Sequence, residues 1–126
     1  MTNYAADLFG ANPVNMKWSI VRGDTAVLRI EFYEDDEVTE YDTSGWEFVS
    51  NTYDFKGDVI DELETEAVDG SVTIIAPADI TKYWGIGYGA VVAELAFDLQ
   101  VTIDNYVWTP VIGTITVIGD VSGGSL

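Results

Sequence analysis

Hydrophobic and polar residues alternate most regularly between residues 90 and 118. Over residues 91–103 every second residue is apolar, and the other phase carries polar side chains such as Glu94 and Asp98. This period of two is typical of a strand with one buried face and one wetter face. Asp104-Asn105 then interrupts the pattern, and a second β-branched run follows. Both residue types tolerate the left-handed backbone of a tight turn. The sequence therefore predicts a long antiparallel hairpin.

Turn residues divide the rest of the chain into shorter segments. Gly23-Asp24, Lys56-Gly57-Asp58 and Asp69-Gly70 are turn signals between runs with strand character. Residues 77–84 have helical features, because a proline in the first turn is followed by an acid and then by a lysine. Residues 59–67 would also make a fair helix, but two β-branched residues after a glycine turn favour a strand. The predicted shorter strands are residues 15–22, 25–33, 46–55, 59–67 and 71–76.

This order of elements predicts an all-β fold. The favoured architecture is an antiparallel β-sandwich, immunoglobulin-like or jelly-roll-like, with one short helical turn near residues 77–84; a small open barrel is the main alternative. Pro110 cannot donate a hydrogen bond to a ladder, so it predicts an edge position or a bulge in the second arm of the hairpin. We expect an N-terminal arm over residues 1–14, one domain over residues 15–122 and a flexible tail over residues 123–126.

Composition limits the chemistry of this 126-residue chain. It contains neither cysteine nor histidine. An ordinary structural zinc site, a Ser-His-Asp triad and a Cys-His pair therefore cannot be built. Pairs of carboxylates could act as acid and base, but nothing singles out two of the 22 acids. We expect no catalytic residues and no enzymatic activity. No run approaches the length of a membrane helix, and the N-terminus lacks the features of a signal peptide.

The net charge of −17 narrows the choice of partners. Such a chain repels phosphate backbones and anionic membranes, so we expect it to bind neither nucleic acid nor a membrane. Acids gather at residues 31–42 and 58–69. Their oxygen atoms could bind calcium, with Asp35, Asp36 and Glu37 as the candidates, although no twelve-residue calcium-loop pattern is present. A solvated, self-repelling surface is the favoured interpretation, and no cofactor is expected.

Aromatic residues are more numerous than one small sandwich needs for its core. They could line a carbohydrate platform or a subunit interface, and core packing accounts for some of them. Arg22-Gly23-Asp24 spells a recognition tripeptide of integrin ligands, but its place between two predicted strands favours an ordinary turn. The interface candidates are Tyr4, Leu8, Phe9, Trp18, Trp84, Tyr88 and Trp108. The wider aromatic set adds Trp46, Tyr53, Phe55 and Tyr83.

The order of these parts resembles a family of small β-sandwich domains in accessory structural proteins of tailed-phage virions. It is similar to the N-terminal domain of siphophage baseplate upper proteins. The similarity covers about residues 19–122, in short pieces made of common strand and turn types. The matching stretches are IVRGDTAVLRIEF (20–32), YDTSGWEFVSNTYD (41–54), DGSVTIIAPADIT (69–81), FDLQVT (97–102) and GTITVIGDVS (113–122).

The resemblance implies attachment rather than catalysis. It implies a virion structural protein, made in the host cytoplasm, that forms homo-oligomers and binds capsid, neck or tail proteins. The expected role is a capsid decoration (cement) or head-tail accessory protein that holds its neighbours through strand edges and the N-terminal arm. The alternatives are a tail, baseplate or fibre attachment domain and a carbohydrate-binding or host-adhesion module, including one stabilised by calcium.

Overall fold

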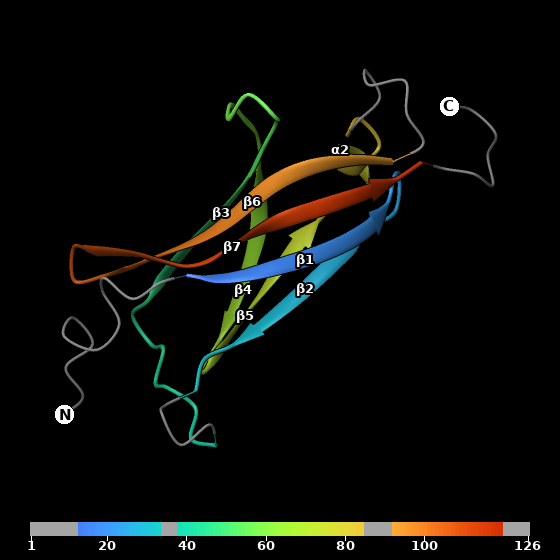
Figure 1. Ribbon diagram of the computed structural model, residues 1–126. Helices are drawn as coiled ribbons and strands as arrows, with labels where there is room; N and C mark the ends of the chain where they lie inside the picture. The colour runs from blue at the N-terminus through green and yellow to red at the C-terminus, as the bar shows by residue number, and fades with distance from the viewer. Residues whose placement is uncertain (1–12, 34–37, 85–91, 120–126) are drawn as a thin grey trace.

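The structure is a computed structural model that describes residues 13–33, 38–84 and 92–119. It is almost entirely β (Figure 1), which confirms the predicted fold class. The described residues form seven strands and one short helix. They are β1 (Val14–Val21), β2 (Ala26–Glu31), β3 (Glu47–Tyr53), β4 (Val59–Val68), β5 (Ser71–Ala76), α2 (Ala78–Thr81), β6 (Val92–Ile103) and β7 (Tyr106–Ile118).

All seven strands belong to one sheet in the order β1-β7-β6-β3-β4-β5-β2. β4 connects two layers, because it pairs with β3 through Val59–Leu63 and with β5 through Glu64–Val68. β1 and β2, the two ends of the sheet, are joined by one tight turn, so the sheet folds over into a nearly closed barrel (Figure 1). The two layers of the predicted sandwich are thus parts of one continuous sheet.

One pair of strands departs from the antiparallel prediction. β1 pairs with β7 in parallel, from Val14 opposite Val111 to Val21 opposite Ile118. The reason is topological: after β1 the chain turns into the other layer, where β2 pairs with β5. β1 therefore finds its partner at the far end of the chain. Such a pairing has no local signature in the sequence.

The β6–β7 hairpin is confirmed in detail. Asp104 and Asn105 both have positive φ, at 48° and 71°, as a tight hairpin turn of this hand requires. Buried and exposed residues alternate along β6 with the predicted phase. Leu99 lies opposite Val111 and Val101 opposite Trp108, so β7 contains an extra residue next to Pro110. Of the two predicted options, an edge position or a bulge, the bulge is present, and it lies just before the point where β1 begins to pair.

Two shorter elements also match their predictions. Residues 59–67 form a strand, β4, and not a helix. The helical turn is present as α2, which is shorter than the predicted segment. It is held by Thr81, whose fully buried hydroxyl donates to Asp24 O at 2.8 Å and accepts from Gly23 N at 3.2 Å. The Arg-Gly-Asp tripeptide therefore serves as the β1–β2 turn and as the anchor of α2.

Aromatic side chains fill a large part of the core. Five of them contact one another at one end of the barrel, with the Phe32 and Trp46 ring centroids 5.2 Å apart. Farther along, Trp18 packs edge-on against Phe97 at 5.7 Å. Trp84 closes the end beside α2 and donates from Nε1 to Asp61 Oδ2 at 2.8 Å. The five aromatic residues that contact one another, here called the aromatic cluster, are Phe32, Tyr41, Trp46, Phe48 and Trp108.

Candidate functional site

Two tryptophans that were predicted as interface residues are buried in the core. Trp18 exposes 7% of its surface and Trp84 2%, so both pack inside the chain and cannot face another subunit. They are core residues because they lie on the inward phase of β1 and at the closed end beside α2. Trp108 is half-buried against the aromatic cluster. Tyr4, Leu8, Phe9 and Tyr88 lie outside the described residues.

The calcium candidates also lie outside the described residues, since Asp35, Asp36 and Glu37 belong to residues 34–37. Within residues 13–33, 38–84 and 92–119, no group of three or more acids is placed to hold a metal ion. In the same part of the chain, no helix is long and apolar enough to cross a membrane.

The outward side of β1, β7, β6 and β3, here called the outer face, carries exposed or half-buried side chains along all four strands. Its side chains follow the strand registers, with Asn15, Ile112, Asp98 and Asn51 in one row across the four strands. Several outward residues on this face are apolar and exposed despite the high charge of the chain. They are Val21, Val49, Val92 and Ile112.

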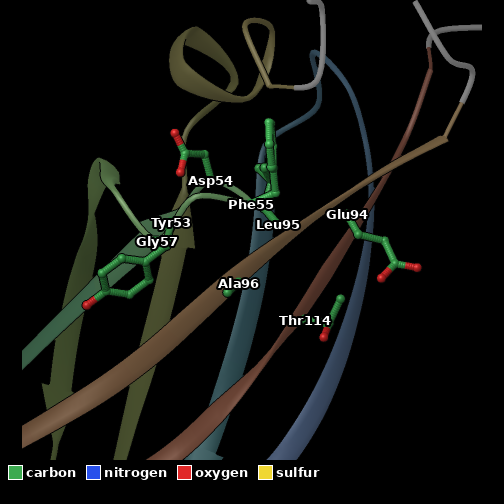
Figure 2. A pocket seen from close by; sticks show the side chains of 8 residues that line it. All are labelled: Tyr53, Asp54, Phe55, Gly57, Glu94, Leu95, Ala96 and Thr114. Carbon is green, nitrogen blue, oxygen red and sulfur yellow. The ribbon is translucent and has the colours of Figure 1, made fainter. Parts of the chain in front are cut away.

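A shallow hollow of about 490 Å³ lies where the β3–β4 hairpin rises beside the outer face (Figure 2). Phe55 and Asp54 stand on the hairpin side, and Glu94 and Thr114 stand on the opposite side, on β6 and β7 (Figure 2). Phe55 is 75% exposed at the hairpin tip. The hollow is lined by Tyr53, Asp54, Phe55, Gly57, Glu94, Leu95, Ala96 and Thr114.

Hydrogen bonds fix the shape of this hollow. Asp54 Oδ1 accepts from the backbone N–H groups of Lys56 at 2.9 Å and Asp58 at 3.0 Å, which sets the hairpin and places Phe55 at its tip. Tyr53 donates from its hydroxyl to Asp98 Oδ2 at 2.8 Å. Partial burial, and then this bond to a carboxylate, raise the pKa of Tyr53 above its ordinary value.

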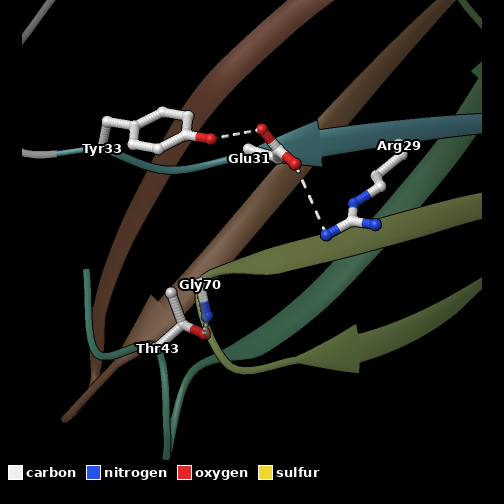
Figure 3. A network of polar contacts seen from close by, with 5 residues as sticks. All are labelled: Arg29, Glu31, Tyr33, Thr43 and Gly70. Atoms are coloured by element: carbon white, nitrogen blue, oxygen red, sulfur yellow. Dashed lines mark hydrogen bonds and ion pairs between the residues drawn. The ribbon is translucent and has the colours of Figure 1, made fainter. Parts of the chain in front are cut away.

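A second polar network lies on β2 and the loop after it (Figure 3). Glu31 accepts from the Tyr33 hydroxyl at 2.5 Å and lies 3.4 Å from the guanidinium of Arg29. The bond to Glu31 is the main cause of the raised pKa of Tyr33. Nearby, the hydroxyl of Thr43 accepts from Gly70 N at 2.8 Å, which ties the β2–β3 connection to the β4–β5 turn. The Thr43–Gly70 bond joins two loops, and the Arg29–Glu31–Tyr33 contacts run along a single segment.

The hollow can contact an apolar, aromatic or hydroxylated group, because it combines an exposed ring with carboxylate and hydroxyl oxygens. Sequence reasoning placed Tyr53 and Phe55 in a wider aromatic set but did not connect them with Glu94 or Thr114. Those residues come together only through the β3–β6 and β6–β7 registers. The polar phase of residues 91–103 did point to the outward position of Asp98.

Comparison with known proteins adds no family: no protein-family model matches the chain, and no curated protein matches it.

Proposed function

We propose that this chain is a non-enzymatic structural protein of tailed-phage virions that binds neighbouring virion subunits, as a capsid decoration or head-tail accessory protein. The family resemblance over residues 19–122 supplies the virion context. The observation that carries the attachment role is the exposure of apolar side chains on the outer face and at Phe55, in a chain with a net charge of −17. Apolar side chains that stay exposed on a strongly charged surface can serve as contacts to another protein.

Charge favours a basic or neutral neighbour. The chain has 22 acids against five bases. On the outer face, Glu94 and Asp98 lie on β6, and Lys17 lies on β1. A basic subunit would gain apolar contact with Ile112 and Phe55 while the acids steer its approach.

Copy number in the particle tests the virion role. Quantitative mass spectrometry on virions of the phage that encodes the chain should find it at a fixed ratio to the capsid protein. A lattice-like number, on the order of hundreds, fits decoration of the shell, and a ring-like number of about six or twelve fits the neck, tail or baseplate. Absence from purified particles would refute the virion role.

Substitutions of exposed apolar residues test whether the outer face and the neighbouring hairpin tip form the attachment surface. Phe55→Ser and Ile112→Ser should each reduce incorporation into particles while leaving the fold intact, because both side chains are exposed. Val68→Ser is the matched control, since Val68 is also exposed but lies at the end of β4, in the other layer. Equal incorporation of all three variants would exclude the outer face as the attachment surface.

The hollow supports a second candidate, a carbohydrate-binding or host-adhesion module. A sugar ring can stack on Phe55 while its hydroxyl groups donate to the Glu94 carboxylate. A glycan array with the intact chain tests this role. Binding that Phe55→Ala abolishes and Val68→Ser retains would favour adhesion over attachment.

A further inference from the structure

β2 lies at one end of the sheet and has a free edge. It pairs with β5 along one side, and among the described residues its other side pairs with no strand. β1, the strand at the other end of the sheet, meets β2 at the Arg22-Gly23-Asp24 turn and runs apart from it, which leaves an opening (Figure 1). The unpaired N–H and C=O groups of such an edge can accept a further strand.

The backbone groups of alternate residues point to this free edge. Phe32, which directly follows β2, uses its own groups on the side of β5: its N–H donates to Gly70 O at 2.9 Å, and its C=O accepts from Tyr41 N at 3.0 Å. Successive residues of a strand direct their backbone groups to opposite sides, so those of Arg29 and Glu31 point to the free edge. A strand added there would form its hydrogen-bonded pairs with these two residues.

The side chains of the same two residues carry opposite charges on the outward side of β2. Arg29 is 60% exposed and Glu31 39%, and Nη2 of Arg29 lies 3.4 Å from Oε1 of Glu31 (Figure 3). The other carboxylate oxygen accepts from the hydroxyl of Tyr33. A guanidinium has five N–H donors, more than one carboxylate oxygen can accept. Arg29 can therefore bind a second carboxylate that approaches along the edge.

Charge selects one register for a second copy of β2 at this edge. Two antiparallel copies keep their inward side chains on one face only in registers that differ by two residues. In one of these registers Arg29 faces the Arg29 of the second copy, and in another Glu31 faces the second copy's Glu31. The register between them places Ile30 at the two-fold axis, and there Arg29 of each copy faces Glu31 of the other. Like charges directly opposite destabilise a strand pair, and opposite charges stabilise it.

We propose that two copies of this chain associate by antiparallel pairing of their β2 edges, with Ile30 at the two-fold axis. Each Arg29 then lies between Glu31 of its own strand and Glu31 of the second copy. The same register places Val27, 57% exposed in the single chain, opposite Tyr33, 41% exposed, in both halves of the pair. An aromatic residue opposite a β-branched one further stabilises paired strands.

A second copy suits this edge because the edge complements itself. A two-fold interface uses the same surface on both molecules, so each group must meet its complement on an identical strand. β2 supplies a base and an acid at the spacing that this symmetry requires. The proposal goes beyond the attachment role, since it needs no virion and uses an edge on the opposite layer from the outer face.

Charge exchange tests the register on the purified chain. Light scattering after size exclusion should give the mass of two chains for the native sequence. Arg29→Glu should raise the dissociation constant about tenfold or more, because two opposite pairs become like-charge pairs. Arg29→Glu combined with Glu31→Arg should restore the native mass. Lys17→Glu is the matched control, since it makes the same change of net charge on the outward side of β1.

A disulfide trap gives an independent readout, because the chain has no native cysteine. Val27→Cys combined with Tyr33→Cys should form covalent dimers on non-reducing gels after mild oxidation. A link within one molecule is excluded, since six residues of extended chain span about 20 Å and a disulfide needs Cα atoms about 4.4–6.8 Å apart. Each single variant is a control, because neither residue faces its own copy in this register.

The other outcomes contradict the proposal. A native chain that keeps the mass of one chain at all accessible concentrations would overturn it. A charge exchange that does not restore the mass, or single cysteine variants that link as well as the combined one, would exclude this register. The virion role would survive each of these results, because copy number in particles tests it separately.

Discussion

Replacing Gly113 with alanine should weaken the attachment of β1 to the sheet. A Cβ atom at this position would lie 2.2 Å from the carbonyl oxygen of Met16 and 2.6 Å from Cε1 of Phe97. Non-bonded heavy atoms pack at about 3.5–4.0 Å, so the β1 backbone would have to move by about 1 Å or more. Met16 is the register partner of Gly113, and the movement therefore strains the β1–β7 ladder itself.

The size of the effect follows from two opposing contributions. Overpacking of this kind costs about 1–3 kcal/mol, and the upper end applies because the displaced atom belongs to the backbone of a paired strand. Alanine restricts the unfolded chain more than glycine does, which returns about 0.4–1 kcal/mol. We expect a net loss of about 1–2.5 kcal/mol in the free energy of unfolding.

Urea denaturation followed by tryptophan fluorescence measures this loss. The midpoint should fall with an unchanged slope, since the same surface is exposed on unfolding. Gly45→Ala is the comparison, because Gly45 has φ +82° and nothing within 4 Å of an added Cβ. Both variants lose stability, but only Gly113→Ala should speed amide exchange along β1. A Gly113→Ala chain as stable as the native one would refute the reasoning from close approach.

Three further predictions concern side-chain hydrogen bonds. Thr81→Val should lower the unfolding free energy by about 1–3 kcal/mol, as measured in urea, because two turn groups lose their buried partner, and Thr81→Ser should recover most of it. Tyr53→Phe should remove a decline in stability above about pH 10. The raised pKa keeps the folded tyrosine protonated longer than the unfolded one, so stability is complete below the unfolded pKa and is lost as pH rises through the folded pKa. Melts across alkaline pH for both chains check it, and an unchanged profile would exclude the titration of Tyr53 as a cause. Ser44→Ala should raise the pKa of Asp42, which the Ser44 hydroxyl and N–H hold below its ordinary value, and NMR titration of the Asp42 carboxyl should show the rise. In the native chain, the stability that these bonds contribute is present above the unfolded pKa of Asp42 and is lost as pH falls through the folded pKa.

Local pattern was sufficient for most elements because their determinants are local. Strand periodicity located β6 and β7, and the Asp104-Asn105 pair located their turn, since both residues must adopt positive φ there. The missing N–H of Pro110 predicted an edge position or a bulge in β7, and the structure has the bulge. For residues 59–67, where helix and strand patterns competed, the strand is the element that the sheet needs to connect its two layers.

Local pattern could not identify which aromatic residues are buried. Trp18 and Trp84 looked like interface candidates, but both are core residues. Burial of a tryptophan depends on which strands surround it, and β1 reaches its partner β7 across most of the chain. Phe55, in contrast, is 75% exposed at the tip of a short hairpin, whose turn is set by the hydrogen bonds of Asp54.

The sequence by itself therefore determined the all-β class, the strands, the turns, the short helix and the acidic surface. Each of these depends on residues close together in the chain or on composition alone. Only the tertiary structure decided the parallel β1–β7 pair, the continuous sheet, the hollow beside Phe55 and the opening between β1 and β2. Those features depend on contacts between strands that are distant in the sequence. Several registers and several neighbouring strands would each bury apolar surface and form hydrogen bonds, and the sequence pattern alone does not distinguish among them.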